Sequence, residues 1–230
     1  MQIYDVVVIG GGPAGCQAAI SAAHQMRYVL VIDAGRISPR KGRAYWSKEV
    51  LLEDVPVFEG LTGPQLSRKL HKWLSSRPVK EVLIAGQQRL SGIDHRGGVV
   101  LDLKRQEDGL FVLKTSVKSL KQGEALSVEY FQGRTVVITS GFEDAWPDIE
   151  VEDGSERQLH RFKAVFRYAG NARGWHVCIR CDGHLHVNQH LAIVGVGDYI
   201  YEVAIGAQDF TDKMTILTTG RPNGISQEVL

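Results

Sequence analysis

The chain has 230 residues, of which 43% are apolar and 23% are charged, and its formal net charge is +1. This composition is typical of a globular protein with a sizeable core, and the near-neutral charge argues against the basic face of a nucleic-acid binder. No stretch approaches the ~18 apolar residues of a membrane span, and three cysteines are too few for a disulfide-stapled secreted fold, so we expect a cytoplasmic protein.

The first predicted elements form a βαβ unit. A β-branched run at residues 4–9 predicts a buried parallel strand, the alanine-rich segment 13–24 predicts a helix, and the apolar run 28–32 predicts a second strand. This order of elements within about 30 residues is typical of a nucleotide-binding unit.

A glycine-rich turn joins the first strand to the helix. The run Gly10-Gly11-Gly12-Pro13-Ala14-Gly15 satisfies G-x-G-x-x-G. In this motif the first glycine permits a tight turn, the second lets the backbone approach a pyrophosphate, and the third lets the helix pack closely on the strand. Asp33 ends the second strand, where a carboxylate can accept hydrogen bonds from ribose hydroxyls. The context disfavours an empty glycine turn, but the motif does not choose between FAD and NAD.

The middle of the chain predicts a long functional loop, a helix and an antiparallel meander. The loop covers residues 35–63, and residues 64–74 show helical spacing with proline in the first turn. Strand-like runs between residues 81 and 140 predict a meander that returns to the parallel sheet at residues 135–139. The polar stretch 148–158 predicts a boundary between domains at 1–150 and 151–230.

A second strand–glycine–helix unit follows, with strands at residues 191–194 and 214–217 around a helix at 198–208. A nucleotide-fold domain opened near residue 160 needs on the order of 100 residues to close, so we expect the chain to be incomplete at its C-terminus. The predicted fold class is α/β, with two dinucleotide-binding (Rossmann-like) domains and an antiparallel β-meander in the first.

Cys178 and Cys181 form a C-x-x-C pair, which suits redox chemistry. Arg180 between them could lower a thiol pKa, and the carboxyl of Asp182 could move the proton of thiol–disulfide exchange. Zinc is the alternative, because Cys178, Cys181, His184 and His186 spell C-x-x-C-x-x-H-x-H. That spacing is tighter than in structural zinc sites, so we expect no metal. A supporting role for His176 or His184 stays open.

The GGGPAG turn and the strand end Thr139-Ser140-Gly141 resemble those of flavoproteins with two dinucleotide-binding domains. CIRCDG, followed by a strand and GVGD, resembles the low-molecular-weight thioredoxin reductases over nearly the whole chain. The resemblance implies an FAD-dependent homodimer in which Cys181 faces the flavin, Cys178 attacks a thioredoxin-like protein disulfide, and Asp182 is the acid/base. It implies FAD contacts at Gly10, Gly12, Pro13, Ala14, Gly15, Asp33, Ala34, Arg43, Ser140 and Gly141.

The site for the pyridine nucleotide departs from that pattern. Ile200 replaces the third small residue of the second turn, Tyr199 adds bulk, and residues 217–221 lack the basic cluster that grips the 2′-phosphate of NADPH. Losing two charge-assisted hydrogen bonds costs about 3–6 kcal/mol, so NADPH is a doubtful donor. The segment RYAGNARGWHVCIRCDGHLH is similar to that of diflavin-linked disulfide oxidoreductases, in which a second flavin would replace the nicotinamide nucleotide. Ferredoxin-linked relatives fit equally well.

The leading hypothesis is therefore an FAD-dependent disulfide oxidoreductase that passes electrons through Cys178 and Cys181 to a protein disulfide, with a donor such as ferredoxin. Its enzyme alternative is an NADPH-dependent thioredoxin reductase. The alternative from another class is a non-catalytic nucleotide- or zinc-binding sensor.

Overall fold

The computed structural model describes residues 2–36, 51–52, 55–117, 127–142, 174–176, 178–226 and 228. The chain divides into two compact units, one formed by Met1–Leu51 and Gly60–Glu143, the other by Leu52–Glu59 and Asp144–Leu230. The predicted boundary at residues 148–158 lies outside the described residues. Within the described ranges, the chain contains no helix with the length and apolar character needed to cross a membrane.

The first unit is built on a seven-stranded mixed sheet in the order β3-β4-β2-β1-β7-β6-β5. Four neighbouring strands run parallel: β4 (Gln87–Gly97), β2 (Tyr28–Asp33), β1 (Ile3–Ile9) and β7 (Val128–Ile138). At one edge β3 (Lys80–Ile84) pairs antiparallel with β4. At the other edge β6 (Phe111–Ser116) and β5 (Val99–Arg105) add the antiparallel meander.

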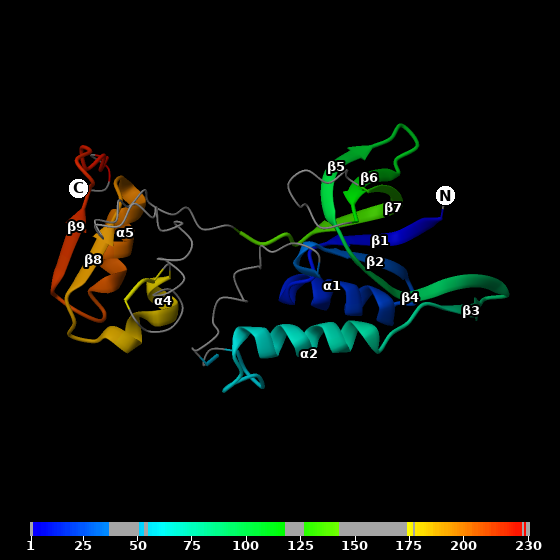
Figure 1. Ribbon diagram of the computed structural model, residues 1–230, viewed down its shortest axis with the longest axis horizontal. Coiled ribbons are helices and arrows are strands. Elements are labelled where there is room, and N and C mark those ends of the chain that lie inside the picture. Colours follow the sequence, from blue (N-terminus) through cyan, green and yellow to red (C-terminus); the bar gives the residue numbers. More distant parts are fainter. Residues whose placement is uncertain are drawn as a thin grey trace. The chain divides into compact units, whose positions relative to one another are not determined.

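Within the described residues, two α-helices pack beside this sheet. Helix α1 (Pro13–His24) packs on β1 and β2 through small residues such as Cys16 and Ala19, both fully buried. Helix α2 (Gly63–Ser75) runs alongside α1 (Figure 1). Its start is fixed by Gln65, whose side-chain oxygen accepts a hydrogen bond from the Thr62 N–H at 2.7 Å.

The core of the first unit lies where the parallel strands meet the meander. Its buried cluster comprises Tyr4, Val7, Tyr28, Leu30, Ile32, Leu113 and Phe131. Tyr4 and Tyr28 stack with ring centroids 4.3 Å apart, and the Tyr4 hydroxyl donates to Asp94 Oδ2 at 2.8 Å. Every residue of β2 is buried, as expected of a central strand covered on both faces.

The structure confirms the predicted strands and helices at residues 4–9, 13–24, 28–32 and 64–74, and the meander through β5, β6 and β7. It differs in three places. The run at residues 81–86, predicted as part of the meander, forms β3 at the opposite edge of the sheet, where it pairs with β4. Strand β4 was not predicted, because its first residues are polar and lie exposed in a hairpin with β3. Residues 128–138 form one strand instead of two runs separated at Gly133, where a β-carbon would lie 2.5 Å from the Val7 side chain of the neighbouring strand.

The second unit contains a shorter βαβ arrangement. Strands β8 (Leu191–Val194) and β9 (Met214–Leu217) pair in parallel, and helix α5 (Asp198–Ala207) connects them, as predicted. In the same unit, before β8 in the sequence, lie the one-turn helix α4 (Ile179–Asp182) and a 3₁₀ turn at Gly183–His186. The ring of Phe210 packs against Gly183.

Candidate functional site

The first glycine turn lies where the carboxyl ends of three parallel strands meet. The Gly10 N–H donates to Ile32 O of β2, and the Thr139 N–H donates to Ile9 O of β1, both at 2.8 Å. The Thr139 hydroxyl also donates to Ile9 O at 2.9 Å. Crevices at the carboxyl edge of a parallel sheet are the usual ligand sites of α/β folds.

The three motif glycines have different surroundings. Gly10 has φ +112°, which favours glycine, and a β-carbon there would overlap the Thr139 carbonyl. A β-carbon at Gly15 would overlap the carbonyl oxygen of Gly10. At Gly12 nothing lies within 4 Å of the β-carbon position. The turn is therefore closed at its two ends and open at Gly12, which is the space a pyrophosphate needs above a helix N-terminus.

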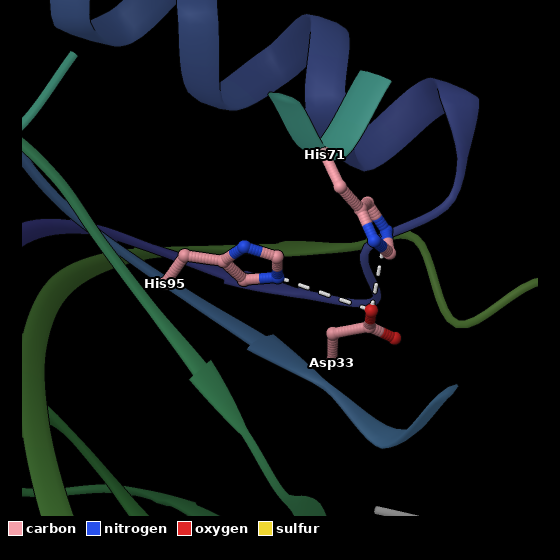
Figure 2. Close-up of side chains that lie close together, drawn as sticks. All are labelled: Asp33, His71 and His95. Carbon is pink, nitrogen blue, oxygen red and sulfur yellow. Dashed lines mark ion pairs between the residues drawn. The ribbon is translucent and has the colours of Figure 1, made fainter. Parts of the chain in front are cut away.

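Asp33 ends β2 beside this turn and is held by two histidines (Figure 2). His71 of α2 brings its Nε2 to 3.3 Å from Asp33 Oδ2, and His95 of β4 brings its Nε2 to 3.9 Å. The His71 Nε2 also lies 3.0 Å from the carbonyl oxygen of Gly11. Because both neighbours of this nitrogen are hydrogen-bond acceptors, the nitrogen carries a hydrogen. Through His71, helix α2 is therefore hydrogen-bonded to the glycine turn.

Electrostatics keep the carboxyl of Asp33 ionised. Burial alone would raise its pKa, but the nearby imidazole of His95, the hydrogen bond from the Gly35 N–H and the imidazole of His71 together hold the pKa below its ordinary value. The ligand atoms of Asp33, His71 and His95 lie within 4.8 Å of one another, but the hydrogen on His71 Nε2 leaves that nitrogen without a lone pair for a cation. A ribose hydroxyl donating to Asp33 is the competing use of the same carboxylate.

Several residues predicted to contact a cofactor gather at this edge. Gly12, Pro13 and Ala14 are exposed on the turn, Ala34 directly follows β2, and Ser140 and Gly141 are exposed beyond β7. Arg43 lies outside the described residues. His71 and His95 were not predicted, since their contacts with Asp33 join residues 38 and 62 positions apart in the sequence.

Cys178 and Cys181 are joined in a disulfide in the second unit, with Cα atoms 5.3 Å apart. Cys178 precedes α4, and its carbonyl accepts the N–H groups of Cys181 and Asp182 at 3.1 and 3.2 Å. Cys181 is exposed and Cys178 half-buried. In this oxidised form neither sulfur is available as a thiolate ligand for the zinc alternative.

Asp182 has a partner that the sequence only hinted at. Its Oδ2 lies 2.9 Å from Nδ1 of His176, two residues before Cys178. His176 also contacts the ring of His186, with centroids 4.3 Å apart. The spacing of four histidines around C-x-x-C is a visible signal, but it does not show which of them meets the acid.

The second glycine turn is occupied by the chain's own residues. Gly195 and Gly197 have φ +150° and +90°, so both need glycine. A β-carbon at Gly195 would lie 2.6 Å from the Ile200 side chain, which fills the space at the start of α5. The Gly197 N–H, which a pyrophosphate would need, donates to Asn223 O at 2.6 Å.

The chain is similar to known proteins over most of its length. The family model described as "Pyridine nucleotide-disulphide oxidoreductase" matches residues 4–222. A thioredoxin reductase of Bacillus subtilis (strain 168) is 29% identical over 216 residues, covering 94% of this chain and 54% of that protein. A ferredoxin–NADP reductase of Streptococcus pneumoniae serotype 4 is 29% identical over 176 residues, covering 74% of this chain and 45% of that protein.

Solved structures share the fold. A thioredoxin reductase from Streptococcus pyogenes matches with a TM-score of 0.68 at 22% identity, covering 99% of this chain and 59% of that one. One from Giardia duodenalis matches with a TM-score of 0.70 at 16% identity, covering 100% and 60%. The chain thus spans about half the length of the curated relatives it matches. With the family model matched over nearly its whole length, the chain belongs to the pyridine nucleotide-disulphide oxidoreductase family.

Proposed function

We propose that this protein is an FAD-dependent disulfide oxidoreductase that passes electrons through Cys178 and Cys181 to a disulfide of a thioredoxin-like protein. One observation carries the proposal: a C-x-x-C disulfide followed directly by a carboxylate lies in one chain with a glycine turn open at Gly12. The similarity to a protein named thioredoxin reductase in Bacillus subtilis supports it.

The residues of the first unit fit the proposed FAD. The open space at Gly12 and the N-terminus of α1 receive the pyrophosphate, and the ionised Asp33 accepts hydrogen bonds from ribose hydroxyls. Ala34, Arg43, Ser140 and Gly141 are the further contacts that we assign to it. When bound, FAD supplies the two-electron chemistry that interconverts disulfide and dithiol.

The residues of the second unit divide the exchange between them. We assign Cys181 as the sulfur that faces the flavin and Cys178 as the one that attacks the partner's disulfide. Cys178 directly precedes the helical turn α4 and lies two residues after His176 in the sequence. A helix start and a nearby imidazole both favour the thiolate form of a cysteine. Asp182 takes part in moving the proton that exchange requires.

The electron donor is proposed not to be NADPH. Ile200 fills the start of the second glycine turn, the Gly197 N–H is engaged by Asn223, and Arg221 stands without the basic cluster of NADPH-dependent relatives. The similarity to a protein named ferredoxin–NADP reductase supports a ferredoxin as a partner, although the same name also includes NADP. An alternative form of the same proposal places a second flavin at the second glycine turn, in place of the nicotinamide nucleotide. The proposed assembly is a homodimer, in the cytoplasm.

Cofactor content is the first test. The purified chain should carry FAD, identified by its absorption spectrum and by chromatography of the released nucleotide and counted per chain. One flavin supports the single-cofactor form, and two support the diflavin form. Stoichiometric zinc without a borohydride-reducible disulfide would contradict the redox assignment and favour a sensor.

Donor identity is tested by rapid mixing of the flavin-loaded protein with NADPH. We expect little bleaching of the flavin absorbance, because two lost charge-assisted hydrogen bonds weaken binding roughly a hundred- to ten-thousandfold. Reduced ferredoxin should bleach it. Fast bleaching by NADPH would establish the ordinary NADPH-dependent reductase instead.

Cysteine roles are tested by a pair of variants. Cys178→Ser should show a thiolate–flavin charge-transfer band, because Cys181 stays free beside the ring, and Cys181→Ser should show none. Identical spectra for the two variants would contradict the division of roles.

A further inference from the structure

His176 and Asp182 lie on either side of the redox disulfide and are hydrogen-bonded to each other. His176 stands two residues before Cys178, and Asp182 directly follows Cys181. The Asp182 N–H donates to Cys178 O, so the single turn of α4 folds the acid back over the start of the pair. The imidazole Nδ1 then lies 2.9 Å from the carboxylate Oδ2.

The carboxylate sets the tautomer of this imidazole. A carboxylate only accepts hydrogen bonds, so the Nδ1 of His176 carries a hydrogen and the Nε2 of the neutral ring presents a lone pair. Within the described ranges, this Nε2 is buried and no protein group donates to it. The same constellation, an acid fixing Nδ1–H so that Nε2 can accept a proton, orients the base of a nucleophile–histidine–acid triad.

A second histidine, His186, packs against the ring of His176. His186 Nδ1 lies 2.9 Å from the Gln189 amide oxygen, which also leaves its Nε2 as an acceptor. The His186 ring packs against the His176 ring, with ring centroids 4.3 Å apart and an angle of 63° between the two ring planes. Among the residues that the structure describes, the titratable groups shown in contact with His176 are Asp182 from α4 and His186 from the 3₁₀ turn.

We propose that the imidazole of His176 holds the proton that thiol–disulfide exchange moves, and that Asp182 acts through it as a positioning residue. This inference rests on the proposed redox function of Cys178 and Cys181. It changes the role of Asp182, to which the resemblance assigns the acid/base function alone.

The exchange balances in two steps. The Cys178 thiolate attacks one sulfur of the substrate disulfide, forming a mixed disulfide, and the departing substrate thiolate takes the proton from the His176 imidazolium. The neutral imidazole then removes the proton of the Cys181 thiol. The resulting thiolate attacks Cys178 Sγ, which restores the Cys178–Cys181 disulfide and releases the second substrate thiolate, protonated by water. Two electrons pass from the cysteine pair to the substrate.

The test uses the reduced 230-residue chain with oxidised glutathione as probe, so that it needs no bound flavin. Exchange rates are measured from about pH 5 to about pH 9, a range that spans ordinary imidazole and thiol titration. His176→Gln should slow exchange about a hundredfold at neutral pH and lose the rise in rate that the wild-type chain shows in the imidazole range. The difference in exchange rate between His176→Gln and the wild-type chain should become smaller as the pH nears about 8.5, where thiols ionise without a base.

Two further variants complete the design. Asp182→Asn should also slow exchange, because an amide oxygen no longer attracts a charged ring and the amide nitrogen permits the opposite tautomer. His190→Gln is the matched control, an exposed histidine of the same unit whose Nε2 contacts Thr215 Oγ1 at 2.8 Å, and should match the wild-type chain.

The outcomes separate this inference from the proposed function. A wild-type chain that exchanges normally with an unchanged pH profile in His176→Gln would overturn the role of His176 alone. A reduced wild-type chain that does not react with glutathione disulfide would overturn the redox function and this inference with it. Should His176→Gln fail to fold, long-range ¹⁵N–¹H spectra of the wild-type chain decide: Nδ1–H is expected for His176, and an Nε2–H tautomer would refute the proposal.

Discussion

Gly15 lies directly against the carbonyl oxygen of Gly10, so closely that a β-carbon on Gly15 would overlap it. Helix α1 can begin at Pro13 and still touch β1 only because this position has no side chain. Gly12, three residues earlier, has no such neighbour. The two glycines therefore have different roles. Gly15 allows close packing of the helix, and Gly12 leaves open space at the turn.

Substituting these two glycines separates folding from cofactor binding. Gly15→Ala should lower the free energy of unfolding by about 1–3 kcal/mol, the usual cost of overpacking. Gly12→Ala should leave it unchanged within about 0.5 kcal/mol, since its φ of −75° suits alanine, yet weaken FAD binding. Urea titrations of the flavin-free chains and fluorescence titrations with FAD measure the two effects. An FAD affinity unaltered by Gly12→Ala would argue against a pyrophosphate at this turn.

Acidification should reveal the contribution of Asp33. Its pKa is lowered in the folded chain, so the folded state stays ionised where the unfolded chain is protonated, and the group stabilises the fold above the unfolded value of about 3.9. That contribution is lost as the pH falls through the lowered folded pKa. The stability difference between the wild-type chain and Asp33→Asn should therefore be full near pH 6 and shrink below about pH 4.

The control for that experiment is Glu107→Gln, which removes an exposed carboxylate of the same unit. It gives the baseline effect of losing one surface charge in the same urea titrations. A difference between wild-type chain and Asp33→Asn that stays constant with pH would mean that the two histidines do not favour the ionised carboxylate.

Thiol reactivity should distinguish Cys16 from the cysteine pair. Cys16 is fully buried, and burial followed by the nearby charge of Asp33 raises the pKa of its thiol to about 11. At pH 8 only about one molecule in a thousand carries the thiolate. Iodoacetamide followed by mass spectrometry should modify Cys178 and Cys181 after mild reduction and Cys16 only in urea. Rapid labelling of Cys16 in the folded chain would contradict its burial.

The sequence was sufficient for elements whose cause is local. The strand at residues 4–9, the glycine turn and α1 depend on neighbours a few positions apart, so the G-x-G-x-x-G spacing predicts them together. The unit around β8, α5 and β9 was predicted for the same reason.

Features that depend on contacts between residues far apart in the sequence were not predicted. Gly133 lies between two apolar runs of the sequence, yet it belongs to the interior of β7, because Val7 of the neighbouring strand packs over it. His71 looks like one more polar residue of an amphipathic helix, and only the packing of α2 beside α1 brings it to Gly11 and Asp33. Histidine spacing near Cys178 likewise pointed to several partners, and the turn of α4 selects His176 for Asp182.

The last prediction concerns how the redox turn is anchored. A β-carbon on Gly183 would lie 2.5 to 2.8 Å from three carbons of the Phe210 ring, although the backbone angles at Gly183 suit any residue. Gly183→Ala should therefore push the turn off Phe210, lower the stability of the second unit by about 1–3 kcal/mol and disturb the His176–Asp182 contact. Gly206→Ala, in α5 with open space around it, is the matched control and should raise stability by up to about 1 kcal/mol through helix propensity. Urea unfolding followed by tryptophan fluorescence tests both, and equal effects of the two substitutions would show that Phe210 does not hold the turn that carries Cys181 and Asp182.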